Sequence, residues 1–105
     1  PTEETLDTLD SLEEPVQITA FFSPNRPTTN AEAVLERFKF YSDGLVEYEF
    51  IDPLTNPVAA QEANITQDGT LVIEYGDRSE QITNPSELEI TSAIVRLISG
   101  EEHVV

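Results

Sequence analysis

The order of the predicted secondary-structure elements constrains this chain more than any other feature. From Val16 to Ser99, a strand, a helix, a strand, a helix, a β-hairpin and a helix follow one another. The first strand–helix–strand unit predicts two parallel strands. The two-residue connection Gly76–Asp77 between two β-rich segments predicts an antiparallel hairpin. The chain therefore predicts an α/β domain of the order βαβαββα with one mixed four-stranded sheet.

The strand segments differ in their apolar pattern, and this difference predicts their places in the sheet. Residues 16–22 carry apolar side chains on both faces near the end of the strand, which is typical of a central strand with helices on either side. Residues 45–51 alternate between apolar side chains and glutamates, so we expect this strand nearer the sheet edge. Residues 70–75 and 78–83 form the two strands of the hairpin.

Local signals predict where the helices begin and end. Thr29 with Glu32 matches a capping box, and so does Ser86 with Glu89. A further helix is expected to start at residues 56–57, where Asn-Pro provides a cap and a proline at the first helical position.

Two glycines predict helix ends. Gly44 is expected in the left-handed conformation after the first helix, and Gly100 is expected to close the last helix. Residues 1–14 are acidic with leucines at every third position, so they predict either a short amphipathic helix or a linker that ends before Pro15.

The length of 105 residues predicts one folded domain. We assign residues 1–14 to the acidic N-terminal helix or linker, residues 15–100 to the domain, and residues 101–105 to the start of a linker or strand leading into a following domain. The apolar step at residues 103–105 reads as the first strand of that domain, so we expect the chain to be part of a longer protein.

Charge and composition exclude several classes of function. The formal net charge is −16, from 21 acidic and 5 basic residues. Nucleic acid and anionic membrane surfaces are therefore disfavoured as partners. No apolar run approaches the roughly 18 residues that a membrane span needs, so we expect no membrane insertion by this segment. Because the chain lacks cysteine, disulfides, zinc–thiolate sites and thiol catalysis are excluded.

The elements from residue 16 to residue 99 resemble the thioredoxin fold, a three-layer α/β sandwich. The resemblance is carried by Phe50-Ile51-Asp52, Asn56-Pro57, Ala63-Asn64-Ile65 and Thr70–Ile73. The chain departs from that family at two places. The loop of residues 23–29 replaces the Cys-Gly-Pro-Cys motif, and Asp68-Gly69 falls near the expected cis-proline. The resemblance therefore implies the fold without redox activity.

A more extensive resemblance is to the auxiliary proteins of ABC-type transport systems, the gliding-motility (GldG-like) family. Its most specific string is Tyr48–Pro53 followed by Asn56-Pro57. Residues 12–16, 69–79 and 89–94 are similar to the family's opening, its hairpin and its closing helix. The resemblance spans nearly the whole chain.

This second resemblance implies an extracytoplasmic domain without a catalytic residue or a cofactor. Flanking transmembrane helices would tether it to the membrane, beside a permease, an ATPase and a paired auxiliary protein. A homo-oligomer is a further alternative that does not rest on this resemblance. We expect a role in protein–protein or cargo contact, and no enzyme activity. The alternative is a solute- or glycan-binding module that presents its ligand to the transporter.

The loop after the first strand is the first candidate contact surface. It lies at the carboxyl end of a central strand and before a helix, where ligands often bind in open α/β sheets. Backbone N–H groups there, with the side chains of the loop, would suit an anion or a carboxylate. The alternative is a loop stiffened by prolines in which one threonine caps the helix. The candidate residues are Ser23, Asn25, Arg26, Thr28 and Thr29.

The hairpin is the second candidate surface, because its final strand would offer an edge for pairing with another subunit. The alternative is a polar, solvated edge. The candidate residues are Glu74, Asp77, Arg78 and Glu80.

Catalytic and ligand-groove interpretations are weaker. Glu47 and Glu49 share a strand face about 7 Å apart, but solvated positions explain them better than a hydrolase pair. His103 is the only histidine and has no nucleophile beside it, so we interpret it as a linker residue. The aromatic residues Phe38, Tyr41, Tyr48 and Phe50 are expected in the core rather than along a groove.

Overall fold

The computed structural model describes residues 2–102. Four helices and four strands are present in this part of the chain. Their order is α1 (Glu3–Asp10), β1 (Val16–Phe21), α2 (Thr29–Tyr41), β2 (Val46–Ile51), α3 (Pro57–Glu62), β3 (Thr70–Tyr75), β4 (Arg78–Ile82) and α4 (Glu87–Glu102).

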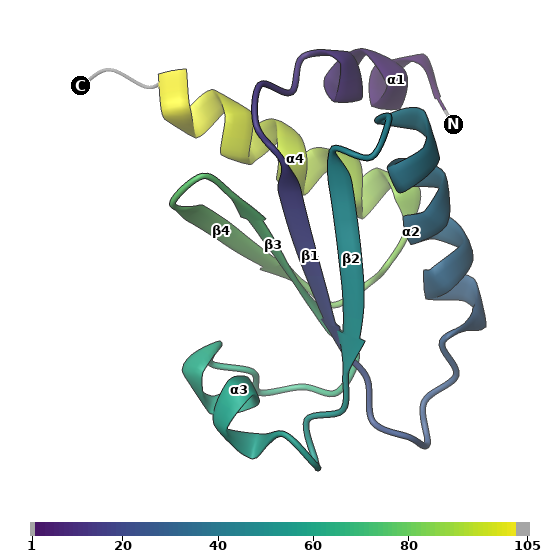
Figure 1. Cartoon of the computed structure of the whole chain (residues 1–105), viewed down its shortest axis with the longest axis vertical. Coiled ribbons are helices and arrows are strands. Elements are labelled where there is room, and N and C mark those ends of the chain that lie inside the picture. The colour runs from purple at the N-terminus through teal and green to yellow at the C-terminus, as the bar shows by residue number, and fades with distance from the viewer. Residues whose placement is uncertain (1, 103–105) are drawn as a thin grey trace.

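The strands form one mixed sheet in the order β2-β1-β3-β4 (Figure 1). β1 is central, and it pairs in parallel with β2 and antiparallel with β3. β3 and β4 form the antiparallel hairpin, in which Tyr75 lies opposite Arg78. The predicted mixed sheet, the central first strand and the edge position of the second strand are confirmed.

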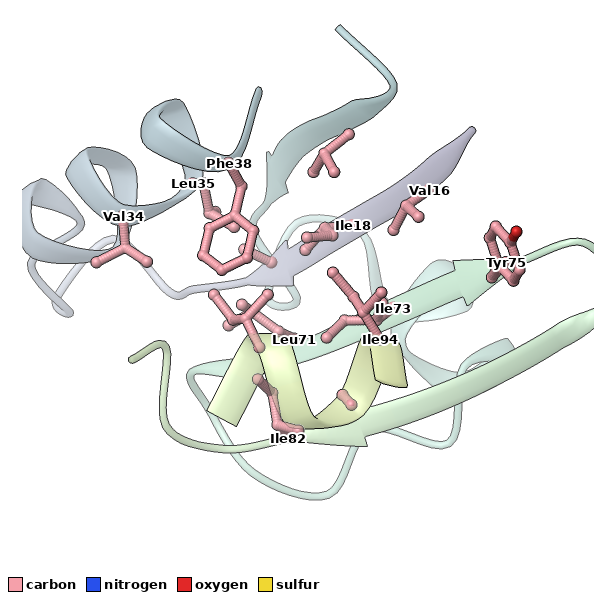
Figure 2. Close-up of a cluster of buried hydrophobic side chains, with 14 of the residues drawn as sticks. Val16, Ile18, Val34, Leu35, Phe38, Leu71, Ile73, Tyr75, Ile82 and Ile94 are labelled. Carbon is pink, nitrogen blue, oxygen red and sulfur yellow. The ribbon is translucent and has the colours of Figure 1, made fainter. Parts of the chain in front are cut away.

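One face of the sheet holds the hydrophobic core. Alternate residues of the strands point to this face, where α2 packs on β2 and α4 packs on β3 and β4. Figure 2 shows side chains from the strands and from both helices meeting there. The largest side chains that are almost fully buried are Val16, Ile18, Leu35, Val46, Leu71, Ile73, Ile90, Ile94 and Leu97.

The opposite face of the sheet is only partly covered. Figure 1 shows α3 at one end of the sheet, and α3 has no buried residue within its described length. Gln81 Nε2 of β4 donates a hydrogen bond to Ala63 O at 2.6 Å, just after α3. The same face carries Glu47, Glu49 and Glu74, and all three are exposed. The helical layer on this face, formed by α3, therefore covers the sheet only in part.

The N-terminal segment is a helix that belongs to the folded unit. α1 contacts both α4 and α2. Leu9 and Leu12 are in the core, at 3% and 8% exposure. Thr5 Oγ1 lies 2.9 Å from Thr91 Oγ1 in α4 and donates to Glu87 Oε2 at 2.9 Å. Between the two alternatives, the helix is confirmed and the linker is wrong for residues 3–10.

Two of the three predicted helix starts differ in detail from the structure. Thr28, not Thr29, precedes α2, and its side chain makes no capping hydrogen bond. The capping box predicted at Thr29 is therefore wrong, because Thr29 is already the first helical residue. Asn56 precedes α3 as expected, but its Nδ2 donates to Asp52 O instead of capping.

At the third helix start, one of the two hydrogen bonds of the predicted capping box is present. Glu89 N–H donates to Ser86 Oγ at 3.2 Å, so Ser86 caps the N-terminus of α4.

The two glycines expected at helix ends have different roles. Gly44 follows α2 with a φ of 85° and its N–H donates to Lys39 O, so the predicted left-handed end is confirmed. Gly100 does not end the last helix, because α4 continues to Glu102. A Cβ at Gly100 would clash with the guanidinium group of Arg78. Gly100 therefore makes room for a strand residue, and the expected strand at residues 103–105 lies outside the described residues.

Candidate functional site

The loop between β1 and α2 is fixed at the carboxyl end of the sheet. Phe22 N–H continues the pairing with β2 by donating to Ile51 O at 3.1 Å. On the other side of β1, Gly69 N–H donates to Phe21 O at 2.7 Å. The start of the loop therefore lies beside the segment that leads into β3, although the two are far apart in the sequence.

Ser23 and Asp68 join these two segments. Ser23 Oγ donates to Asp68 Oδ2 at 2.5 Å, and Ser23 N–H donates to Asp68 Oδ1 at 2.8 Å. Both carboxylate oxygens of Asp68 are thus engaged by one residue. The Ser23 hydroxyl bond lowers the pKa of Asp68 below its ordinary value of 3.8, against an opposing effect of burial. The Ser23 backbone N–H and Arg26 lower this pKa further.

Arg26 completes the cluster. Its Nε lies 3.5 Å from Asp68 Oδ2, and its side chain is 48% exposed. The guanidinium carbon lies 6.0 Å from the centre of the Phe22 ring, which in turn meets Phe50 edge-on. A Cβ at Gly69 would come within 3.0 Å of the Arg26 guanidinium. Arg26 is therefore held between the carboxylate, an aromatic ring and a glycine backbone.

The structure brings together only two of the five loop residues that the sequence predicted. Ser23 and Arg26 meet at Asp68, while Asn25 lies farther along the loop, Thr28 precedes α2 and Thr29 is the first residue of α2. Within residues 2–102, these three side chains make no hydrogen bond to another part of the chain, and Thr28 is half-buried. Asp68 was missing from the predicted site. Its position near the expected cis-proline was the one signal that pointed to it.

The chemistry of the cluster favours holding the loop over reaction. A serine nucleophile needs a base that accepts its proton. Asp68 is a weak base because its pKa is lowered by the same hydrogen bond that would present the proton. Among the described residues, no group of three or more His, Cys, Asp or Glu side chains is arranged to hold a metal ion. His103 lies outside the described residues.

The hairpin residues do not form a single patch. Arg78 and Glu80 are alternate residues of β4 and point to the α4 face, whereas Glu74 points to the opposite face and Asp77 lies in the turn. Glu80 Oε1 pairs with Arg96 of α4, at 2.8 Å from both Nε and Nη2. The expected hairpin edge is confirmed as the outer strand of the sheet.

The aromatic residues are divided between the core and the surface. Phe38 is buried, and Tyr48 and Phe50 pack against the core, as predicted. Tyr41 is 45% exposed, so its predicted core position is wrong. It lies edge-on to Phe40, which is 72% exposed at the C-terminal end of α2. Tyr41 is the last residue of α2, and Phe38, one turn earlier, is the last buried residue of this helix.

The two strand glutamates remain separate solvated groups. Glu47 and Glu49 are both exposed. Glu47 Oε1 lies 3.6 Å from Lys39 Nζ, in an ion pair between two partly exposed side chains.

A model of one protein family, described as "Domain of unknown function (DUF7088)", matches residues 2–91. The chain belongs to the DUF7088 family. No curated protein matches the sequence of this DUF7088 domain.

Solved thioredoxins share the fold of this DUF7088 domain. The germline-specific thioredoxin Deadhead of Drosophila melanogaster superposes with a TM-score of 0.65 at 12% identity, covering 87% of this chain and 89% of Deadhead. Mitochondrial thioredoxin 3 of Saccharomyces cerevisiae gives 0.65 at 12% identity, with 85% and 98% covered. Fasciola hepatica thioredoxin gives 0.65 at 18% identity, with 86% and 88% covered. The predicted thioredoxin-like fold is confirmed.

The DUF7088 domain differs from a thioredoxin at the place where the predicted resemblance puts the reactive motif. Ser23 begins the loop at that place, and Asp68 stands near the expected cis-proline. Residues 2–102 contain no cis peptide bond, and the chain contains no cysteine. The fold is therefore shared, while the loop carries a serine–aspartate–arginine cluster.

Proposed function

We propose that this DUF7088 domain is a non-catalytic contact module in an auxiliary protein of an ABC transport system. Its partners would be the permease, the ATPase or a paired auxiliary protein of that system. The support is the resemblance to the gliding-motility family, carried by Tyr48–Pro53, Asn56-Pro57 and the hairpin string. The surface that we assign to this contact is the predicted loop of residues 23–29, which includes the first residue of α2.

The observation that carries the proposal is the cluster of Ser23, Asp68 and Arg26. The loop at the place of the reactive motif is tied to the segment near the expected cis-proline by two hydrogen bonds and an ion pair. Such a cluster fixes the shape of the loop, and a fixed loop binds a partner with a smaller loss of conformational entropy. Arg26 stays half-exposed and presents a cation on a strongly acidic molecule.

The domain would lie on the extracytoplasmic side of the membrane in this proposal. Its tether would be transmembrane helices elsewhere in the full-length protein. Within residues 2–102, no helix combines the length and the apolar character that crossing a membrane requires. Membrane attachment is therefore assigned to other segments of that protein.

Co-purification of the full-length protein from membranes of its native host tests the proposal. Arg26→Glu reverses the charge of the loop, and Arg37→Glu makes the same change on an exposed part of α2. We expect the ATPase or permease, identified by mass spectrometry, to co-purify with the wild type and with Arg37→Glu. Recovery with Arg26→Glu is expected to fall at least fivefold.

Two results would contradict the proposal in different ways. Absence of every transporter subunit from the wild-type sample would reject the transport role. Equal recovery of the subunits with both variants would reject the loop as the contact surface.

Binding of a solute or glycan by the same loop is the second candidate function. It is favoured by the exposed side chains of Asn25 and Thr29, which are free to donate and accept hydrogen bonds with a ligand. A thermal-shift screen of sugars and anions tests it. Saturable stabilisation by one ligand class, lost in Asn25→Ala, would favour this function over protein contact.

A further inference from the structure

The two edges of the sheet carry different charge. β2 forms one edge and bears Glu47 and Glu49, both exposed. β4 forms the other edge and carries one cation and one anion, Arg78 and Glu80. Like charges on an edge strand oppose the approach of a second strand, while opposite charges across a strand pair stabilise it. Only the β4 edge therefore has a charge pattern that suits strand pairing.

We propose that the β4 edge pairs with the β4 edge of a second copy of this chain, antiparallel and centred on Ser79. A two-fold antiparallel pair centred on Ser79 puts Arg78 of each copy opposite Glu80 of the other. The register centred on Glu80 would instead put two glutamates opposite each other. The charge pattern of β4 thus selects one register.

The side chains around β4 are compatible with this register. Arg78 and Glu80 point to the α4 face, where Glu80 already contacts Arg96. In the pair, Glu80 would lie between its own Arg96 and Arg78 of the second copy. Ser79 points to the opposite, open face, since it lies between them in the strand. A serine at the two-fold centre is small and uncharged, so it brings neither bulk nor repulsion to the closest contact.

The expected pairing is weak and reversible. β4 has only five residues, and a short strand edge buries much less than the roughly 1,200 Å² of a stable interface. Two chains with a net charge of −16 also repel each other at long range. The β4 edge, with one cation and one anion, therefore determines where the two copies meet. This proposal does not depend on the proposed transport role.

A single cysteine provides a direct test, because the chain has none of its own. Directly opposite residues of antiparallel strands have Cα atoms about 4.5–5.5 Å apart, within the range that a disulfide spans. Under mild oxidation, Ser79→Cys is expected to cross-link into a dimer at least tenfold faster than Glu49→Cys. Glu49 is the matched control, since it is exposed on the same sheet face at the other edge.

Charge reversals in the Ser79→Cys protein test the register. Arg78→Glu places four acidic side chains together in a dimer, and Glu80→Arg places four basic ones, so each should lower homodimer cross-linking at least fivefold. Mixing these two variants restores both opposite pairs, and mixed dimers should form preferentially. Circular dichroism of each variant verifies that it is folded.

Three results would overturn the proposal. Ser79→Cys cross-linking no faster than Glu49→Cys would reject the β4 edge. Unchanged cross-linking in both charge-reversed variants would reject the register. The absence of preferential mixed dimers would reject charge pairing as its cause.

Discussion

At the scale of single residues, Asp68 shows how one side chain closes a site. It accepts two hydrogen bonds from Ser23 and forms an ion pair with Arg26. The carboxylate is therefore occupied by partners within the protein. The carboxylate is about a third exposed, and solvent therefore weakens the ion pair more than the two hydrogen bonds. The hydroxyl bond at 2.5 Å contributes most to the lowered pKa.

Replacing Asp68 by Asn should destabilise the protein by about 1 kcal/mol at pH 7. This is less than hydrogen bonds to charged groups usually contribute, because solvent screens a partly exposed carboxylate. Because the pKa of Asp68 is lowered on folding, its contribution is complete above its ordinary value of 3.8. The contribution is lost as the pH falls through the folded value. The difference in unfolding free energy between wild type and Asp68→Asn should therefore be constant at neutral pH and shrink below about pH 4.

Urea unfolding followed by circular dichroism measures this difference. Asp77→Asn, in the exposed hairpin turn, is the control and should leave the unfolding free energy within about 0.5 kcal/mol. A difference that persists unchanged at low pH would contradict the role given to the Asp68 charge.

Tyr48 provides a second prediction at this scale. Its hydroxyl donates to Glu36 Oε2 at 2.5 Å, and this bond, followed by burial and the Glu36 charge, raises the pKa of Tyr48 to about 12. Folding favours the protonated phenol, so this contribution to stability is complete below pH 10.0 and is lost between pH 10.0 and about 12.

Ultraviolet absorbance of tyrosinate measures the titration. Tyr48→Phe should remove the step near pH 12, and Glu36→Gln should move the step toward pH 10.0. A Tyr48 step that stays at the same pH in Glu36→Gln would show that the hydrogen bond is not its cause.

The sequence predicted part of the candidate site, and the missing part has a physical reason. Ser23 and Arg26 were identified because they follow a central strand. Asp68 is 45 residues away in the chain, so only the pairing of β1 with β3 brings it to Ser23. Local patterns also failed at Thr29 and Gly100. A Thr-x-x-Glu pattern whose threonine is already helical, and a glycine that faces Arg78, look the same in sequence as true helix boundaries.

At the scale of elements, α1 is the part of the fold that local sequence described least well. Its leucines are spaced for an amphipathic helix, but its acidic composition fits a linker equally well. Tertiary contact decides between the two, because Leu9 and Leu12 enter the core and Thr5 meets Glu87 and Thr91. The strands were easier to predict, since each combines an alternation or an apolar run with a turn signal.

Leu9→Ala should lower the free energy of unfolding by about 2–4 kcal/mol, as expected for a large-to-small change at a buried leucine. Leu6→Ala is the matched control on the same helix. Leu6 is 37% exposed, and its truncation should cost less than about 1 kcal/mol. Thermal unfolding of both variants measures the contrast. Equal melting temperatures for the two variants would mean that α1 does not share the core.

At the scale of the whole molecule, an apolar core must overcome the repulsion of a net charge of −16. The core lies on one side of the sheet, while the other side carries the exposed residues Glu47, Glu49 and Glu74. Only three ion pairs occur among the described residues, and all involve partly exposed side chains. Acidic self-repulsion is therefore largely uncompensated in the folded state.

Salt should consequently stabilise this protein. Raising the NaCl concentration shortens the screening length from about 30 Å at 0.01 M to about 3 Å at 1 M, so the urea midpoint should rise. The double variant Glu49→Gln/Glu74→Gln has two fewer carboxylates on the open face, which changes the net charge from −16 to −14. Its midpoint should be higher than that of the wild type at low salt and should rise less as salt is added. A wild-type midpoint that falls with salt would mean that the ion pairs, including Arg26 with Asp68, contribute more than the repulsion.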